Sequence, residues 1–315
     1  MNIAIYLPLI VPQLAAAAAR PLAERLPPRT AAWLLTGSAL ALAVASSAVL
    51  GLLAMGAAFR IPRVDAIGGM SLGVVTRGDP ASLPLGVAAA AALAAAALAA
   101  LRAGWRRAGA MAAAHRQARG LPGSGQVVVV PDEAADAYTV PGWPGRIVIT
   151  SGMLDALSDD EREVLLAHEQ AHAAGCHYLF TAAARLAAAA NPLLRPLAAA
   201  VGYSVERWAD ERAASATGDR PLAARTIAKA ALAAAAAPPR RPSSVMLAAV
   251  PGPASVRRAG PVPRRVEALL RPPPRQRLLL AALTVALVAL SAVAALDAAF
   301  NLHLLVEVAQ AAALR

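Results

Sequence analysis

Two histidines and a glutamate in the middle of the chain have the spacing of a metal-dependent hydrolytic site. His168 and His172 are the first and last residues of the run HEQAH. On a helix, such residues lie about 40° apart around the axis and one turn apart along it, so both imidazoles can reach one metal ion. Glu169, between them, can take a proton from a metal-bound water without binding the metal itself. The pattern predicts zinc-assisted hydrolysis of a peptide bond, in which zinc lowers the pKa of the water toward about 7.

A second acidic cluster, further along the chain, can supply the remaining ligand. Glu206 and Asp210 stand at positions i and i+4, so on a helix they share one face. Two histidines and one glutamate form a standard ligand set of catalytic zinc, with the fourth position left to water. We therefore expect Glu206 to be the third ligand of one Zn²⁺ per chain and Asp210 to orient a ligating histidine. The alternative is a solvated helix whose charged side chains form ordinary surface ion pairs.

Other nearby residues suit the metal less well. His177 would lie about 140° around a continuous helix from His172, so we expect it at an interface or beside the ligands rather than on the metal. Cys176 is expected to be a small buried hydrophobic residue. The remaining carboxylates are poorly placed, either at a rigid offset on the histidine helix or in a loop; they are Glu163, Asp132, Glu133 and Asp136.

The flanking sequence predicts the elements that must position these residues. Residues 126–130 and 146–150 are short β-branched runs bounded by Gly and Pro, which indicates two strands. The second strand is either an open edge to which an extended substrate can add, or part of the core. A helix is expected to begin after Ser158, because Ser158 and Glu161 form a capping box before the apolar face.

The segment between the two motifs is apolar over residues 178–201. The pair Asn191-Pro192 divides it into two pieces that are each too short to cross a bilayer, and Arg185 and Arg195 lie within it. We therefore expect a helical hairpin against the membrane. Residues 236–277 are rich in Pro and Arg and are expected to be a linker.

The composition is that of a membrane protein. Hydrophobic residues make up 58% of the 315 residues, charged residues only 16%, and the mean hydropathy is +0.53. The net charge of +11 does not indicate nucleic-acid binding, because 23 of the 30 basic residues fall between Arg102 and Arg277, as in a loop on the cytoplasmic face. The single cysteine excludes an intramolecular disulfide and fits the reducing side of a membrane.

Four uncharged stretches have about the length that a bilayer requires, roughly 17–25 residues. They are residues 1–19, 31–58, 84–101 and 278–296. For the first, a cleaved signal peptide is the alternative, although no basic residue precedes the apolar run. In the loop after the second stretch, Arg60, Arg63 and Arg77 are partly offset by Asp65 and Asp79. Because arginines are denser around the central loop, we expect the N-terminus outside, the central loop inside and the C-terminus outside.

The motifs resemble those of a known group of peptidases. HEQAH followed by ERWAD is similar to the HExxH…ExxxD pattern of membrane-embedded gluzincins, which include the HtpX and CAAX-prenyl-protease type peptidases and the BlaR/MecR-type antirepressor peptidases. Residues 146–214 look like their catalytic core, and the short hairpin is closest to the BlaR type. Two features depart from the pattern. No penicillin-binding domain is expected after the last span, and Pro261-Val262-Pro263 stands where HtpX-type peptidases have a His-Pro dipeptide.

Together these features predict a mainly α membrane protein with about four transmembrane helices and a cytoplasmic gluzincin-like α+β core with a short β-sheet. The expected division is three transmembrane helices in residues 1–101, a zinc-peptidase core in 102–235 that includes the hairpin, a linker in 236–277 and a last span in 278–315.

The resemblance implies an integral-membrane zinc metalloendopeptidase at the cytoplasmic face of the plasma membrane. Its expected partners are the lipid bilayer and a protein or peptide substrate, with no nucleic acid and with the oligomeric state left open. One alternative is a signalling protease of the antirepressor type that cuts one specific regulator. Another is a non-catalytic membrane scaffold of the same fold, against which the intact Glu169 argues.

Overall fold

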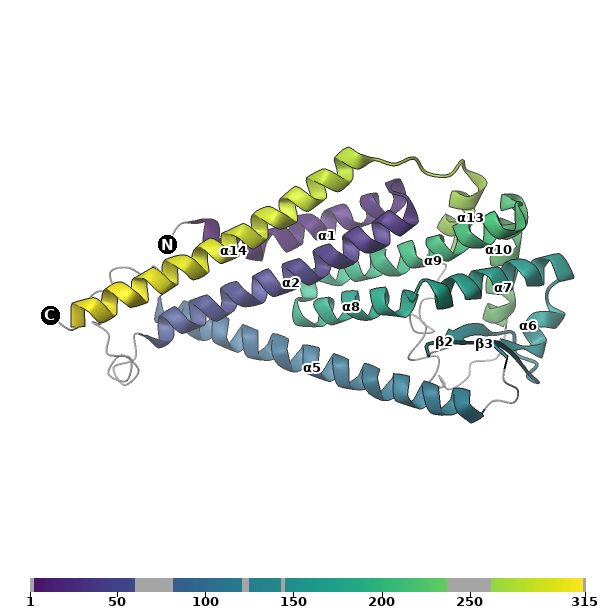
Figure 1. Ribbon diagram of the computed structural model, residues 1–315, viewed down its shortest axis with the longest axis horizontal. Coiled ribbons are helices and arrows are strands. Elements are labelled where there is room, and N and C mark those ends of the chain that lie inside the picture. Colours follow the sequence, from purple (N-terminus) through teal and green to yellow (C-terminus); the bar gives the residue numbers. More distant parts are fainter. Residues whose placement is uncertain (1–2, 60–81, 121–124, 143–144, 237–261, 314–315) are drawn as a thin grey trace.

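The computed structural model describes residues 3–59, 82–120, 125–142, 145–236 and 262–313. Long helices run roughly along the long axis of the molecule, and the small β-sheet lies with short helices at one end (Figure 1). The charged loop expected over residues 60–81 falls outside the described residues.

Three helices in the described part of the chain are long and apolar enough to cross a membrane. They are α2 (Pro28–Ala58), α5 (Leu83–Gly120) and α14 (Leu278–Ala313). They contain three of the four expected stretches and extend beyond them. The first stretch forms α1 (Leu7–Arg25), after a short 3₁₀ helix at Ile3–Tyr6, but α1 is not among these three helices. The count of four spans therefore stays a prediction.

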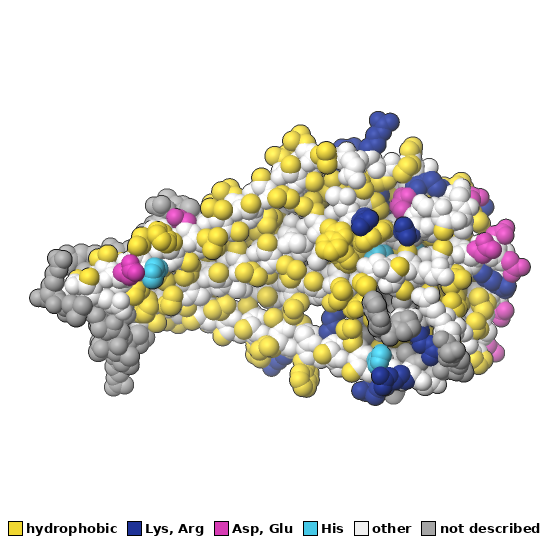
Figure 2. Space-filling model, in the orientation of Figure 1, with side chains coloured by type: hydrophobic (Ala, Val, Ile, Leu, Met, Phe, Trp, Pro, Cys, Tyr) yellow, Lys and Arg dark blue, Asp and Glu magenta, His cyan; other side chains and the backbone are white. Residues whose placement is uncertain are grey.

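The apolar and the acidic side chains lie on different parts of the molecular surface. Hydrophobic side chains cover the face of the long helices seen in Figure 2, whereas acidic side chains gather mainly at the end that carries the sheet. Large apolar side chains are exposed along α5 and α14, among them Trp105 and Leu296, with 83% and 70% of their surface accessible. An apolar exposed surface of this extent indicates contact with lipid.

The β-sheet has three strands, not the two that the sequence predicted. β1 (Val127–Val130) pairs in parallel with β3 (Arg146–Thr150), and β2 (Ala137–Val140) pairs with β3 in the antiparallel sense. The strand order is therefore β1-β3-β2. The interpretation of β3 as an open edge is wrong, because β3 is the central strand. β2 was not predicted, because its four residues, Ala-Tyr-Thr-Val, lack a clear alternation of apolar and polar residue types.

The helix with the HEQAH run begins as predicted. α6 (Ser151–Asp155) follows β3 directly, and α7 spans Asp159–Ala174. The Ser158 backbone N–H donates to Glu161 Oε2 at 2.9 Å, which confirms the capping box. The three acidic residues of the first turn also suit the positive end of the helix.

The apolar segment after α7 folds back on itself. α8 (His177–Ala190) ends at Asn191, whose side chain accepts a hydrogen bond from the Leu193 N–H. A short 3₁₀ helix (Pro192–Leu194) then leads into α9 (Arg195–Thr217). The predicted break at Asn191-Pro192 is confirmed. The fold thus returns the chain along α9 toward α7.

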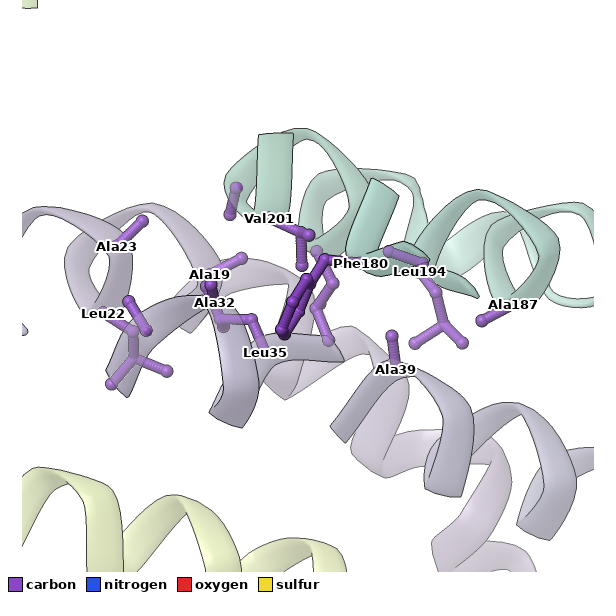
Figure 3. Close-up of a cluster of buried hydrophobic side chains, with 14 of the residues drawn as sticks. Ala19, Leu22, Ala23, Ala32, Leu35, Ala39, Phe180, Ala187, Leu194 and Val201 are labelled. Atoms are coloured by element: carbon purple, nitrogen blue, oxygen red, sulfur yellow. The ribbon is translucent and has the colours of Figure 1, made fainter. Parts of the chain in front are cut away.

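The hairpin packs against the N-terminal helices. Figure 3 shows alanine and leucine side chains of α1 and α2 facing Phe180 of α8, together with Leu194 and Val201. At the end of α1, the buried Arg207 of α9 donates from Nη1 to the Ala23 carbonyl at 2.7 Å. Half of α9 is therefore held within the apolar helix bundle.

The last part of the core comes from two shorter helices. α10 (Arg220–Ala236) and α13 (Val262–Leu270) pack on α7 and α9 through a cluster that includes Val164, Ala213 and Leu269. Of the expected linker at 236–277, residues 237–261 lie outside the described residues. The described residues 262–270 form α13, which contributes to the core.

Candidate metal centre

Three side chains converge on one point between α7 and α9. His168 Nε2 and His172 Nε2 lie 3.2 Å apart. The Glu206 carboxylate oxygens lie 3.8 Å from His168 Nε2 and 3.7 Å from His172 Nε2. Metal–ligand bonds of about 2.0–2.2 Å in a tetrahedral site place neighbouring ligand atoms about 3.4 Å apart. The separations and the set of two nitrogens and one oxygen therefore fit a metal ion with one open position.

The helices bring these ligands together for a simple reason. The i, i+4 spacing puts both imidazoles on the same face of α7. α9 crosses that face, because Val164 of α7 is fully buried against Ala213 and Ala214 of α9. Glu206 lies two turns before Ala213 and so arrives beside the imidazoles.

Asp210 lies directly behind His168, as the sequence suggested for one of the histidines. Its Oδ1 is 3.1 Å from His168 Nδ1, and only 1% of Asp210 is exposed. Burial would lower the pKa of His168, but the hydrogen bond and charge of Asp210 raise it overall. This contact at Nδ1 leaves Nε2 of His168 directed at the ligand cluster.

Arg265 was not identified from the sequence, yet it organises the acidic half of the site. Its guanidinium donates to both Asp210 oxygens, at 2.6 and 2.7 Å, and Nη1 lies 2.9 Å from Glu206 Oε2. Burial alone would raise the pKa of Asp210, but Arg265 holds it well below its usual range. One signal could have found it, since Arg265 shares the buried face of an amphipathic helix with Leu269, one turn later.

Glu169 is held beside the ligands by β2. The Thr139 hydroxyl lies 2.8 Å from Glu169 Oε2 and 2.9 Å from the Glu169 carbonyl oxygen. Glu169 is 7% exposed, and burial raises the pKa of its carboxyl group. A carboxylate with a raised pKa is better suited to accept a proton near neutral pH and to release it again.

His177 lies closer to the ligands than the helical geometry predicted. The angular argument assumed one continuous helix, but α7 ends at Ala174 and Cys176 adopts a left-handed conformation with φ of 49°. His177 Nδ1 consequently lies 3.0 Å from His172 Nδ1. Burial lowers the pKa of His177 to about 3, so its ring is neutral at physiological pH. The contact occupies Nδ1 of His172 and leaves Nε2 for the metal.

A pocket of about 150 Å³ opens in front of these groups. β2 and the following residue Pro141 form one wall, and Tyr178 and Thr181 of α8 form the opposite part of the lining. All three proposed ligands, His168, His172 and Glu206, also line it. The competing carboxylate Glu163 is exposed on α7, and Asp132, Glu133 and Asp136 do not line the pocket.

Comparison with known proteins gives one match. The sequence model of peptidase family M48 matches residues 100–272, which is more than half of the chain. No curated protein and no solved structure matches the chain. The matched region runs from the second half of α5 through α13 and so contains every residue of the cluster.

Removing the Glu206 carboxylate should empty the site of most of its metal. Glu206→Ala deletes one of three ligands, whereas Asp210→Asn keeps all three and loses the negative charge that faces His168 and Arg265. For Asp210→Asn we expect metal affinity to fall about 10–100-fold. Elemental analysis of the purified protein and competition with a chelator measure both effects. Glu163→Ala is the matched control, and a full metal complement in folded Glu206→Ala would show that another residue closes the site.

Replacing Arg265 should weaken both the fold and the metal site. Arg265→Gln leaves the buried Asp210 charge without its partner, which costs about 3–5 kcal/mol of unfolding free energy for such pairs. The melting temperature and the metal affinity should therefore fall together. Arg271→Gln is the control, because Arg271 is exposed and directly follows α13. Equal melting temperatures and metal affinities in the two variants would contradict the assignment.

Proposed function

The chain belongs to peptidase family M48, and we propose that it is an integral-membrane zinc metalloendopeptidase that hydrolyses peptide bonds of protein substrates at the cytoplasmic membrane face. The observation that carries the proposal is the convergence of His168, His172 and Glu206 within 4.8 Å, with Glu169 buried beside them. Two imidazoles and one carboxylate are a ligand set of catalytic zinc.

The proposed roles follow from the positions of the side chains. Zinc, when bound, supplies a Lewis acid that polarises the scissile carbonyl and activates water. Glu169 takes the proton from the attacking water and later delivers it to the leaving amine. Thr139 keeps the Glu169 carboxylate in place through the 2.8 Å hydrogen bond. Asp210 holds the imidazole of His168 and His177 holds that of His172, each at Nδ1.

β2 is the proposed binding edge for the substrate. Among the described residues, β2 pairs with β3 alone, and its residues Ala137, Tyr138 and Thr139 line the pocket. An extended peptide can add to such an edge through backbone hydrogen bonds. This assigns to β2 the role that the sequence had suggested for β3, and it places the scissile bond beside Glu169.

Replacing Glu169 by glutamine should separate metal binding from hydrolysis. Glu169→Gln removes the proton carrier but no ligand, so the protein should keep its zinc and lose at least about 99% of its peptidase activity. Cleavage of a casein or peptide-library substrate and zinc content are measured on the same preparation. Glu163→Gln should retain both properties. Near-normal cleavage by zinc-loaded Glu169→Gln would refute the mechanism.

The proposed orientation rests on the distribution of arginines. Reporter enzymes fused after Ala81, Gly123 and Arg315 should report outside, inside and outside, respectively, because basic loops are retained in the cytoplasm. Paired alkaline phosphatase and fluorescent-protein fusions distinguish the two sides. An outside signal at Gly123 would place the metal site on the other face of the membrane.

A further inference from the structure

Two arginines lie between α5 and α8, next to the pocket. Arg107 of α5 donates from Nη2 to Thr181 Oγ1 at 3.4 Å. Arg185 follows Thr181 by one turn of α8 and repels Arg107 electrostatically. Both arginines are half-buried. Two like charges are thus held close together and partly out of water.

No acidic side chain in the described part of the chain forms an ion pair with either arginine. Neither α5 nor α8 contains an Asp or Glu residue. Arg265, by contrast, is buried with two carboxylates against it. Because removing a cation from water is costly without a counter-charge, an unpaired and half-buried arginine pair is a site for an anion from outside the chain.

The position of the pair indicates which anion it meets. Thr181, which accepts the hydrogen bond from Arg107, also lines the pocket that contains the proposed zinc ligands. Figure 2 shows a gap in the surface between α5 and the neighbouring helices, with basic side-chain atoms at its edge. The exposed Arg102 and Arg106 are better placed to meet lipid phosphates, since they are on the outside of α5. Through Thr181, the arginine pair is therefore linked to the pocket in which a substrate would bind.

The distance along α8 sets the reach of this subsite. His177, which contacts a proposed ligand, lies two helical turns before Arg185, or about 12 Å along the axis at 1.5 Å per residue. An extended peptide advances about 3.3 Å per residue. An anion held by the pair would lie about two to four residues from the bond at the metal.

We propose that Arg107 and Arg185 form a subsite that binds a carboxylate of the substrate, about two to four residues from the scissile bond. The carboxylate belongs to an Asp or Glu side chain or to the peptide C-terminus. This proposal rests on the proposed peptidase function. It adds a substrate class, namely peptides with an acidic group at that distance.

The test uses the full-length zinc-loaded protein in nanodiscs of neutral lipid. Peptides cleaved at one known bond carry Glu, Gln or Arg at each of the five positions on either side, and a second set ends in a free or an amidated C-terminus. We expect Glu or a free C-terminus at one position to raise kcat/KM about tenfold over its neutral counterpart. Arg107→Gln and Arg185→Gln should each remove most of this preference and leave the cleavage of Gln peptides within about twofold.

Three further variants keep the result interpretable. Arg106→Gln, an exposed neighbour on α5, should retain the preference, and so should Arg185→Lys in large part, because it keeps the charge. In the Glu169→Gln background, a fluorescent acidic peptide should bind about tenfold more tightly than its amide analogue, and Arg185→Gln should abolish the difference.

Distinct outcomes would overturn the proposal. Cleavage of Glu and Gln peptides at equal kcat/KM at every position would refute the subsite while leaving the peptidase function intact. Failure to cleave any peptide, together with equal binding of acidic and amide peptides, would refute both. If Arg107→Gln and Arg185→Gln changed activity only in nanodiscs of anionic lipid and left the peptide preference unchanged, the pair would bind a lipid headgroup instead.

Discussion

The site depends on one buried ion pair, the contact between Asp210 of α9 and Arg265 of α13. Both side chains are almost fully removed from water, and each needs the other because an isolated buried charge is strongly unfavourable. The pair also holds two of the proposed metal ligands in place. Asp210 also contacts His168 of α7, and Arg265 also contacts Glu206. Three helices are thereby locked together around the proposed ligands, so the geometry of the site is set by the protein's own charges.

α9 connects this charged network to the apolar helix bundle. Its first half, with Leu197 and Val201, is packed against α1 and α2, and its second half carries the two carboxylates. A helix is stiff over this length, so the packing of the first half sets the position of Glu206. Arg207 strengthens the link through the Ala23 carbonyl. The bundle therefore has two roles, since its outer surface is apolar enough to contact lipid and its inner surface aligns the site.

Local rules in the sequence predicted one part of this arrangement and missed another. The spacing of His168 and His172, the capping box at Ser158 and the break at Asn191 each depend on neighbours within about five residues, and the structure has all three. Glu206 could be predicted as a ligand once a helical hairpin was expected to return the chain toward the two histidines. Arg265 lies 55 positions beyond Asp210, so no local pattern could pair them. The left-handed Cys176 ended α7 early, and that single backbone change brought His177 back to His172.

The two imidazoles are supported in different ways, and charge balance gives a reason. Asp210 supports His168 with a negative charge, whereas His177 supports His172 with a neutral ring, packed against Trp208 at a centroid distance of 4.5 Å. When ionised, Glu169, Glu206 and Asp210 contribute three negative charges, and Arg265 contributes one positive charge. A divalent cation then brings the buried cluster to neutrality. A second carboxylate in place of His177 would leave one uncompensated negative charge in a desolvated site, where such a charge is costly. The neutral histidine therefore orients its neighbour without disturbing this balance.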